Sequence, residues 1–485
     1  MRGVRARVAI GLMFYPRGGS AFVVREIVPR LADAGLSPTL YVGSLGAPGA
    51  STNAETFYAG LPVIGHDYTG AVDAAKTGQD ALDQPIPLHP SYEDRPDAAD
   101  RILTSVSPAL AEKQVAAWAR TFARGEPPDL VHLHHLTPLA DAAAQVWPGR
   151  PVIAHLHGTE LKMLAEIGRR RLQPGGLAGP AWRYTGYWVD RLRSIARRAD
   201  WLVVVSDADV AEAVRWLDAS PDRISVVPNG VDIDRFDRQP LTPQDRLARW
   251  RRWLVEEPLG WDESGRPGSV AYTDADLAAF VDPDTGELRP VLLYVGRFTA
   301  VKRLDMLLRA YARVRAALGP VAPLVVWGGS PGEWEAEHPV TQVRRQGIDG
   351  VFFIGMRGHD DLPDGLACAD LMAAPSTGES FGQVYVEAMA TGVPVVATNS
   401  GGPPSFVNVV PGEPNGWLIP PDDEDALVAA LTQALTEPGE RRRRADHAYE
   451  QIRASYSWAA GVRHLSEVYE TLLMARPSSG TSPTG

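Results

Sequence analysis

The stretch 371-LMAAPSTGESFGQVYVEAMATGVPVVAT-398 contains two short apolar runs, residues 371–376 and 395–398, with a helical segment between them. Both runs are apolar on both faces, which is typical of strands buried in a parallel sheet. A turn containing Gly382 follows the first run, and residues 383–391 are then predicted to form a helix. Strand, helix and strand in succession predict one crossover unit of an α/β sheet.

Comparable apolar runs occur along the whole chain. In the first half they are 8-VAIGLMFY-15, 130-LVHLHH-135, 152-VIAHLH-157, 201-WLVVVS-206 and 224-ISVVP-228, and in the second half 291-VLLYVG-296, 324-LVVWGG-329 and 351-VFFIG-355. Helical stretches lie between them, such as 22-FVVREIVPRLADAG-35, 304-LDMLLRAYARVRAALG-319 and 424-EDALVAALTQAL-435. Because strand and helix alternate in both halves, we predict an α/β protein with two doubly wound sheets.

The length of the chain indicates more than one domain. With 485 residues, of which 45% are hydrophobic, the chain exceeds what a single core usually supports. The strand rhythm breaks after 227-VPNGVDIDRF-236, and residues 61–110 are also irregular. We therefore predict an N-terminal domain over residues 1–238, an insertion or linker over 239–290, a C-terminal domain over 291–456, a helix over 457–475 that crosses back to the first domain, and a disordered tail over 476–485.

The composition argues against several classes of function. A formal net charge of −11 argues against a general nucleic-acid-binding surface. Cys368 is the only cysteine, so no internal disulfide is expected and a cytoplasmic location fits. No apolar run approaches the roughly 18 residues of a membrane span, and the apolar N-terminal run is interpreted as a strand, not as a signal peptide. The basic runs 169-RRR-171 and 441-RRRR-444 could touch anionic lipid, but we interpret them as solvated helix faces and do not expect membrane contact.

Two loops that follow predicted strands carry features suited to phosphate. In 16-PRGGS-20, Gly18 and Gly19 precede a helix and let backbone N–H groups approach an anion, although glycine turns before helices are common. In 296-GRFTAVK-302, Arg297 and Lys302 share one loop and together can neutralise a diphosphate. The alternative is surface solubility, but the chain has only four lysines, so Lys302 stands out. The G-x-G-x-x-G dinucleotide pattern is absent, which argues against a dehydrogenase.

Two glutamates flank the turn in the opening stretch. Glu379 precedes the predicted helix and Glu387 lies inside it, while the N–H groups at the helix start point at whatever occupies the loop. A carboxylate binds a vicinal diol through two charge-assisted hydrogen bonds, so the pair is predicted to hold two sugar rings. The alternative is two solvated glutamates at a helix start.

Histidines follow two of the first-half strands. His155 and His157 follow one strand, and the histidines of 132-HLHH-135 follow another. Alternate histidines suggest a metal site, but no cysteine or carboxylate cluster completes one and the two groups fall on separate strands, so we predict no metal. We expect His157 to face the ligand, because it is nearest to the glycine of the next loop.

Several of these segments together resemble a known family. The segments are 227-VPNGVD-232, 294-YVGRFTAVK-302, 351-VFFIG-355, 370-DLMAAPS-376 and 379-ESFGQVYVEAMATGVPVVAT-398. In order and spacing they resemble the retaining GT-B glycosyltransferases of family 4 across most of residues 1–455, and the E-x7-E element is the most specific part. The resemblance implies two Rossmann-like domains facing across a cleft, with an acceptor site in the N-terminal domain and a nucleotide-sugar site in the C-terminal one. It also implies metal-independent transfer with retention.

The resemblance implies roles for individual residues. Arg297 and Lys302 would hold the donor diphosphate, and Glu387 would hold the ribose. The donor sugar would be held by Glu379 and by the backbone of Ser380, Phe381, Gly382 and Gln383. His157 would lie beside the reacting end of that sugar, and Gly18 and Gly19 would line the phosphate and acceptor side. Two features depart from the family pattern. Gln383 stands where an apolar residue is usual, and the insertion over residues 239–290 is not a standard family part.

The predicted function is transfer of a sugar from a nucleoside diphosphate sugar to a small hydroxylated acceptor. UDP is the default nucleotide and GDP an alternative, with no further cofactor. Glu93 and Arg95, in the polar segment 89-HPSYEDR-95, are predicted to contact the acceptor. Three alternatives remain: transfer to a thiol, epimerisation of the nucleotide sugar, and a non-catalytic nucleotide-sugar sensor. A homodimer is also left open.

Overall fold

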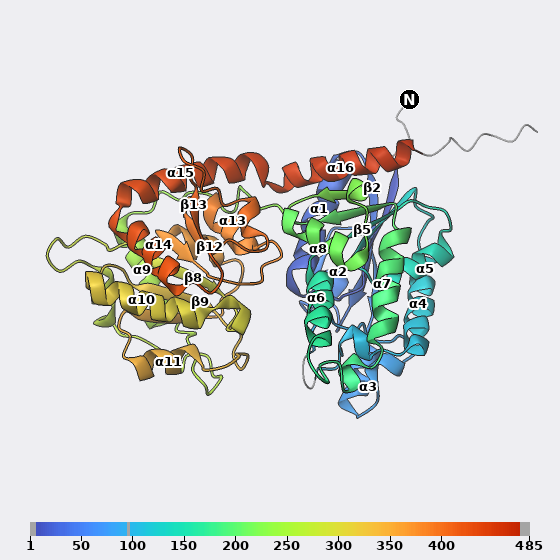
Figure 1. The fold of residues 1–485 in the computed structure, drawn as a ribbon, viewed down its shortest axis with the longest axis horizontal. Helices are drawn as coiled ribbons and strands as arrows, with labels where there is room; N and C mark the ends of the chain where they lie inside the picture. Colours follow the sequence, from blue (N-terminus) through green and yellow to red (C-terminus); the bar gives the residue numbers. More distant parts are fainter. Residues whose placement is uncertain (1–5, 95–97, 476–485) are drawn as a thin grey trace, which may run out of the picture. The chain divides into compact units, whose positions relative to one another are not determined.

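The computed structural model describes residues 6–94 and 98–475. They form two compact units, each built on its own parallel sheet (Figure 1). The first unit contains the described residues up to Asn229 together with those from Trp458 onward, and the second contains Gly230–Ser457. Arg95 and the predicted tail over 476–485 lie outside the described residues.

The first unit contains a seven-stranded sheet in the order β3-β2-β1-β4-β5-β6-β7, in which every neighbouring pair is parallel. The chain starts in the middle at β1, moves outward to β3, and then returns to β4 on the other side of β1. The strand order therefore reverses between β1 and β4. The strands are β1 Arg7–Leu12, β2 Ser37–Ser44, β3 Val63–Asp67, β4 Leu130–His134, β5 Val152–His155, β6 Trp201–Val204 and β7 Ile224–Val226.

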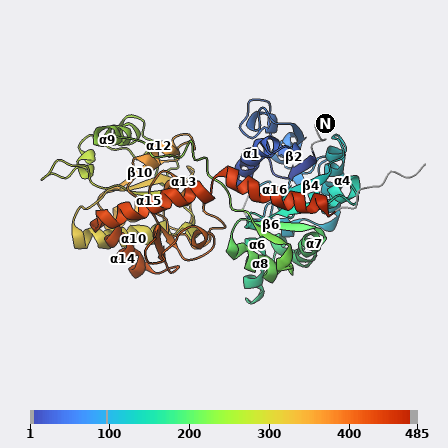
Figure 2. The ribbon, with the colours of Figure 1, turned by 90° about the horizontal axis from the view of Figure 1, so that it is seen from above.

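Helices cover both faces of this sheet. One face packs against α1 and the C-terminal helix α16, which lies along the sheet next to α1 (Figure 2). The other face packs against α4, α5 and α7. The helices of the unit are α1 Gly18–Asp33, α2 Ala54–Phe57, α3 Thr69–Lys76, α4 Pro108–Phe122, α5 Leu139–Val146, α6 Thr159–Arg171, α7 Thr185–Arg198, α8 Asp207–Leu217 and α16 Trp458–Met474.

The second unit contains a six-stranded sheet in the order β10-β9-β8-β11-β12-β13, again parallel throughout. Its order reverses between β8 and β11. The strands are β8 Leu292–Gly296, β9 Leu324–Gly328, β10 Val351–Gly355, β11 Leu371–Ala373, β12 Val395–Thr398 and β13 Gly416–Ile419, and the main helices are α10 Leu304–Leu318, α11 Pro339–Gln346, α12 Leu362–Ala367, α13 Gln383–Ala390, α14 Glu424–Thr436 and α15 Pro438–Ser455. The prediction of an α/β protein with two doubly wound sheets is confirmed.

The segment that precedes β8 packs into the second unit. The segment contains α9 Pro243–Arg251, and the side chains of Trp250 and of Trp253, which follows α9, are buried. The ring of Trp253 packs edge-on against Trp327 of β9, with centroids 5.3 Å apart. The hydroxyl of Tyr272 accepts a hydrogen bond (2.8 Å) from the backbone N–H of Phe353, in the edge strand β10. The segment therefore covers the edge of this sheet, which would otherwise expose unpaired backbone groups.

The structure differs from the expectation for residues 61–110. This stretch is not irregular throughout, because it contains β3 and α3. Strand β3, 63-VIGHD-67, lies at the edge of the sheet and is largely half-buried. An edge strand does not need the continuous apolar run by which the central strands were identified. Among the described residues, no helix is long and apolar enough to cross a membrane.

Candidate active site

The predicted donor residues of the second unit cluster at the reversal in its strand order. Lys302 follows β8 and Glu379 follows β11, the two strands between which the order reverses. Ligands of open α/β sheets bind beyond the carboxyl ends of the strands at such a point. The position of these loops therefore follows from the topology of the sheet.

Lys302 and Glu379 form an ion pair. Lys302 Nζ donates a hydrogen bond to Glu379 Oε1, and the two side chains are 20% and 15% exposed. The backbone N–H of Thr377 donates to the carbonyl of Val301 (2.9 Å), which ties the same two loops together. The cation predicted to hold the diphosphate thus contacts the carboxylate predicted to hold the sugar.

Arg297, the second predicted cation, has an exposed side chain. Its carbonyl oxygen accepts a hydrogen bond from the hydroxyl of the buried Tyr294 (2.9 Å), which fixes the backbone at the end of β8. No carboxylate among the described residues forms an ion pair with its guanidinium. Arg297 is therefore available to an anion, whereas Lys302 is already paired.

The turn before α13 has the conformation that its glycine permits. Gly382 adopts φ +97°, in the left-handed region that favours glycine. Phe381 is buried and packs against Phe406, with centroids 5.4 Å apart, so its side chain belongs to the core. Gln383 Nε2 donates to the carbonyl of Gly230 (2.8 Å), which gives this polar residue a structural partner. Within the described chain, no residue accepts a hydrogen bond from the backbone N–H groups of Ser380, Phe381 or Gly382, so these donors are free for a ligand.

The glycine pair in 400-SGG-402 was not predicted from the sequence. The N–H of Gly402 donates to the carbonyl of Glu379 (3.1 Å). A Cβ atom on Gly401 would overlap the same carbonyl oxygen, and one on Gly402 would overlap the carbonyl of Phe381. The loop after β12 therefore requires glycine at both positions to support the turn that carries Glu379. The signal that could have indicated it was a glycine pair in the loop after a buried strand.

Glu387 is buried in α13 and is paired with His359, which was not predicted from the sequence. His359 Nε2 donates to Glu387 Oε1 (3.1 Å), and the side chain of Glu387 is 5% exposed. Arg235 donates to the carbonyl of His359 (2.6 Å). His359 is in the loop after β10, so its position beyond the carboxyl end of a strand could have indicated it.

The predicted residues of the first unit lie beyond the carboxyl ends of β1 and β5. Gly18 adopts φ +67° at the start of α1, and no atom lies within 4 Å of the place where a Cβ would stand on Gly18 or Gly19. This space is open to a ligand. The neighbouring Arg17 pairs with Asp100 and donates to the hydroxyl of Tyr15 (2.9 Å).

His157 follows β5 and contacts a second histidine. His134 Nδ1 and His157 Nε2 are 2.9 Å apart. Burial, with the nearby His155, His135 and His132, holds the pKa of His157 well below its usual value. The imidazole is therefore neutral near pH 7 and can exchange hydrogen bonds without carrying charge.

Glu93 has an exposed side chain, and its backbone N–H donates to Ser91 Oγ (3.1 Å). Its predicted partner in acceptor binding, Arg95, lies outside the described residues. The acceptor role of this segment therefore stays a prediction.

Comparison with known proteins identifies the family. The model for Glycosyltransferase Family 4 matches residues 17–235, and the model for Glycosyl transferases group 1 matches residues 280–451. A D-inositol 3-phosphate glycosyltransferase from Nocardioides sp. is 31% identical over 379 residues, which cover 73% of this chain and 71% of the relative. The corresponding enzyme of Saccharomonospora viridis is also 31% identical and covers 72% of this chain and 71% of its own. The chain belongs to glycosyltransferase family 4.

Solved structures show the GT-B fold for this glycosyltransferase. Sucrose-phosphate synthase from Thermosynechococcus elongatus aligns with a TM-score of 0.65 at 21% identity, covering 97% of this chain and all 100% of that one. Anabaena HepE in complex with UDP and glucose aligns with a TM-score of 0.61 at 18% identity, covering 96% and 100%. The resemblance inferred from the sequence motifs is confirmed.

The glycosyltransferase brings its two groups of histidines together, and the expectation that separate strands keep them apart is wrong. Strands β4 and β5 are neighbours, and His134 stands opposite His155 in their register. One ring nitrogen from each of His132, His134 and His155 lies within 4.8 Å of the other two. Sequence spacing did not reveal this because it contains no information about which strands pair.

Three further polar residues, Glu160, His135 and Asp209, follow the carboxyl ends of β5, β4 and β6. Glu160 is fully buried, and His135 Nδ1 lies 3.3 Å from its Oε2. Burial opposes ionisation of Glu160, but His135 and Thr159 hold its pKa below the usual value. Burial raises the pKa of Asp209, which follows β6, to about 7. Perturbed carboxylates beyond strand ends are common in functional sites, and none of these residues was predicted.

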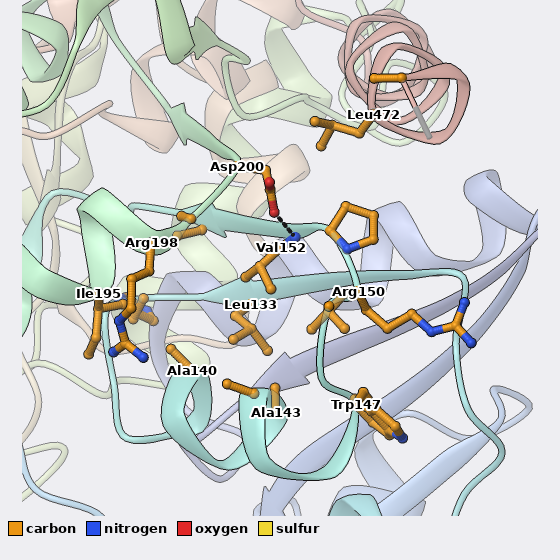
Figure 3. Close-up of a pocket in the computed structure, with 18 residues that line it drawn as sticks. Leu133, Ala140, Ala143, Trp147, Arg150, Val152, Ile195, Arg198, Asp200 and Leu472 are labelled. Carbon is orange, nitrogen blue, oxygen red and sulfur yellow. Dashed lines mark hydrogen bonds between the residues drawn. The ribbon is translucent and has the colours of Figure 1, made fainter. Parts of the chain in front are cut away.

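A cavity of about 410 Å³ also lies in the first unit, between α5 and α7 (Figure 3). Its lining includes the apolar Leu133 and Trp147, and Arg150 and Asp200, which precede β5 and β6. Asp200 accepts a hydrogen bond from the N–H of Val152 (2.8 Å) at the start of β5. Because much of the cavity lies towards the amino ends of the strands, we do not assign sugar transfer to it.

Proposed function

We propose that this glycosyltransferase transfers a sugar from a nucleoside diphosphate sugar to a small hydroxylated acceptor, with retention of anomeric configuration and without a metal ion at the diphosphate. The observation that carries the proposal is the ion pair between Lys302 and Glu379 at the strand-order reversal of the second sheet. The cation proposed for phosphate and the carboxylate proposed for sugar hydroxyls are thus hydrogen-bonded to each other.

The donor would occupy the loops around this pair. Lys302 and the exposed Arg297 would bind the diphosphate, together with the free N–H groups before α13. Glu379 would accept hydrogen bonds from the hydroxyls of the sugar, and the buried Glu387 would hold the ribose. On binding, Lys302 would exchange its contact with Glu379 for the phosphate oxygens. The binding of UDP and glucose by HepE supports UDP as the nucleotide, with GDP as the alternative.

The leaving diphosphate gains negative charge as the bond to the sugar breaks. Lys302, Arg297 and the backbone N–H groups would stabilise this charge in the transition state. For retention on one face, the acceptor oxygen forms its bond to the anomeric carbon on the side that the diphosphate leaves. A phosphate oxygen of the leaving group takes the proton of the acceptor hydroxyl, so no protein base is needed. The neutral His157 would serve as a hydrogen-bonding group beside the reacting carbon.

The acceptor belongs on the first unit, near Gly18, Gly19 and Glu93. The D-inositol 3-phosphate glycosyltransferases that resemble this chain are named for a phosphorylated cyclitol acceptor. We therefore propose a small polyol, free or phosphorylated, as the acceptor class.

Product analysis tests the proposal directly. The purified protein would be incubated with UDP- and GDP-sugars and with a panel of polyols, polyol phosphates and thiols, and the anomeric configuration of any glycoside would be read by proton NMR. We expect an O-glycoside with the configuration of the donor, formed in EDTA without added Mg²⁺ or Mn²⁺. An inverted product, or strict dependence on either ion, would overturn the proposed mechanism. An S-glycoside, an epimerised donor, or binding without turnover would instead establish one of the alternatives.

A further inference from the structure

Three imidazoles stand side by side in the core of the first unit. His132 and His134 alternate along β4, and His155 stands next to His134 on β5, so all three side chains point to the sheet face that α1 and α16 cover. Their exposed fractions are 0%, 0% and 2%. The same layer otherwise contains apolar side chains such as Ile10 and Leu12, the strand neighbours of His132 and His134.

We propose that His132, His134 and His155 bind one transition-metal ion of the zinc class. One ring nitrogen from each residue lies within 4.8 Å of the other two. The separation between His132 Nε2 and His155 Nδ1 is 3.2 Å. Two nitrogens that share a tetrahedral zinc ion at ~2.1 Å stand about 3.4 Å apart, so this pair needs little movement to become ligands. His134 would have to approach by a side-chain adjustment.

Hydrogen bonds outside the cluster orient the rings for this role. His132 Nδ1 lies 2.6 Å from the hydroxyl of Tyr469 in α16, and His134 Nδ1 lies 2.9 Å from His157 Nε2. When each Nδ1 donates to its neighbour, the lone pair of each ring is on Nε2 and points away from these partners. Imidazoles that bind metals commonly donate their other N–H in this way.

The Nε2 atom of His134 is buried and lacks a hydrogen-bond partner among the described residues. A buried imidazole nitrogen with no partner is unfavourable, and a bound ion would accept a lone pair from such a nitrogen.

The surroundings select the kind of ion. Three imidazoles with no oxygen ligand suit Zn²⁺ and similar ions, not the Mg²⁺ or Mn²⁺ that bind phosphate oxygens. They leave one tetrahedral position for a water molecule. The buried carboxylate of Glu160 is connected to His134 through His157 and His135. His134 contacts His157, and His135 contacts both the ring of His157 and Glu160. The negative charge of Glu160 would partly offset the charge of the ion.

This ion differs from a catalytic metal at the diphosphate, because its ligands belong to the first unit and the donor residues to the second. Its presence does not depend on the proposed transfer reaction. Binding of the ion, not turnover, is therefore the measurement that decides.

Cobalt titration tests the site. The full-length protein, dialysed against a chelator and then against metal-free buffer, would be titrated with Co²⁺ and followed by its visible absorption. We expect one equivalent to bind with the intense bands of a four-coordinate nitrogen site, and Zn²⁺ to displace it and raise the melting temperature. Absence of such bands in the wild-type protein would overturn the proposal, whatever the variants do.

Variants show whether the bound ion occupies this cluster. His134→Asn should weaken Co²⁺ binding by about 100-fold or more, since one of three ligands is lost. Tyr469→Phe keeps the buried ring but removes the hydroxyl beside His132, so we expect a loss of about tenfold to 100-fold in a protein that still folds. The matched control His464→Asn changes an exposed histidine of α16 and should bind as the wild type does. Equal binding by folded His134→Asn or Tyr469→Phe and the wild type, or loss in the control, would place the ion elsewhere.

Discussion

Lys302 and Glu379, which lie 77 positions apart in the sequence, form an ion pair. The pair joins the loop after β8 to the loop after β11 at the carboxyl ends of two adjacent strands. Each residue therefore satisfies the other until a ligand competes for both. A nucleotide sugar offers phosphates to the lysine and hydroxyls to the carboxylate, so it can replace one contact with two.

Lys302→Met should lower kcat by about 10²–10³, the loss typical of removing one electrostatic contact to the transition state. The effect on nucleotide affinity should be smaller, because the full charge of the leaving group develops only in the transition state. Steady-state kinetics and nucleotide titration measure the two effects separately. Lys76→Met, which changes an exposed lysine of α3, is the control and should leave both unchanged. A normal kcat for Lys302→Met would show that other groups stabilise the leaving diphosphate.

Glu379→Gln should separate nucleotide binding from sugar binding. Without the carboxylate, Lys302 is free before the ligand arrives, so the affinity for free UDP should rise roughly threefold to tenfold, on the order of 1 kcal/mol. Turnover of the nucleotide sugar should fall, because a contact to the donor sugar is lost. Isothermal titration with UDP, combined with kinetics on the sugar donor, tests both directions. Weaker UDP binding would mean that Glu379 supports the nucleotide site and does not compete with it.

His359→Ala should raise the KM for the donor by roughly tenfold, the effect of one lost hydrogen bond to a buried carboxylate. The physical reason is that His359 holds Glu387 Oε1, and without it the carboxylate predicted to bind ribose is free to turn. His359→Gln keeps an N–H donor and should recover part of the loss. A merely structural role would instead lower the melting temperature of both variants and leave the KM unchanged.

Asp209→Asn should change how stability depends on pH. The pKa of Asp209 is raised by burial from 3.8 to about 7, with Glu160 and Glu212 adding to the rise and Ser206 and Lys162 opposing it. The folded state thus binds the proton of Asp209 more tightly than the unfolded state. The stabilising contribution of this protonated carboxyl is fully present below about pH 4 and is lost as the pH rises through 7. The difference corresponds to roughly 4 kcal/mol of unfolding free energy. Asp209→Asn should remove this loss.

Denaturant unfolding at pH 5 and pH 8 measures the effect. The variant should gain stability over the wild type at pH 8 and much less at pH 5. Asp207→Asn, at an exposed position of the same first turn of α8, is the control and should not change how the unfolding free energy depends on pH. If Asp209→Asn left the pH dependence of the unfolding free energy unchanged, the carboxylate would not be destabilised by burial.

Glu93→Ala should raise the KM for the acceptor by about tenfold, if this exposed carboxylate contacts the acceptor as proposed. The kinetic constants for the donor should not change, since the donor residues belong to the other unit. Glu55→Ala, an exposed glutamate of α2, is the control. Unchanged acceptor kinetics in folded Glu93→Ala would remove this segment from the acceptor site.

Local sequence patterns were sufficient for the central strands and for the helix after Gly382. The runs 291–296, 324–329 and 395–398 contain β8, β9 and β12, because a strand buried on both faces is apolar at every position. The edge strand β3 was missed, since an edge strand can alternate or carry polar groups; β2 and the edge strand β13 were not identified either. The motif around Glu379 and Glu387 was recognisable because its residues are contiguous in the chain.

The sequence by itself determined the fold class, the family and which loops carry charged or glycine-rich motifs, because apolar periodicity and contiguous motifs are properties of short segments. Only the tertiary structure decided which of these residues meet. Lys302 reaches Glu379, and His359 reaches Glu387, because β8 lies beside β11 and β10 precedes a loop that returns to α13. Likewise, His134 stands opposite His155 because β4 and β5 pair. Strand order and register arise from packing across the whole sheet, and no single segment of sequence contains them.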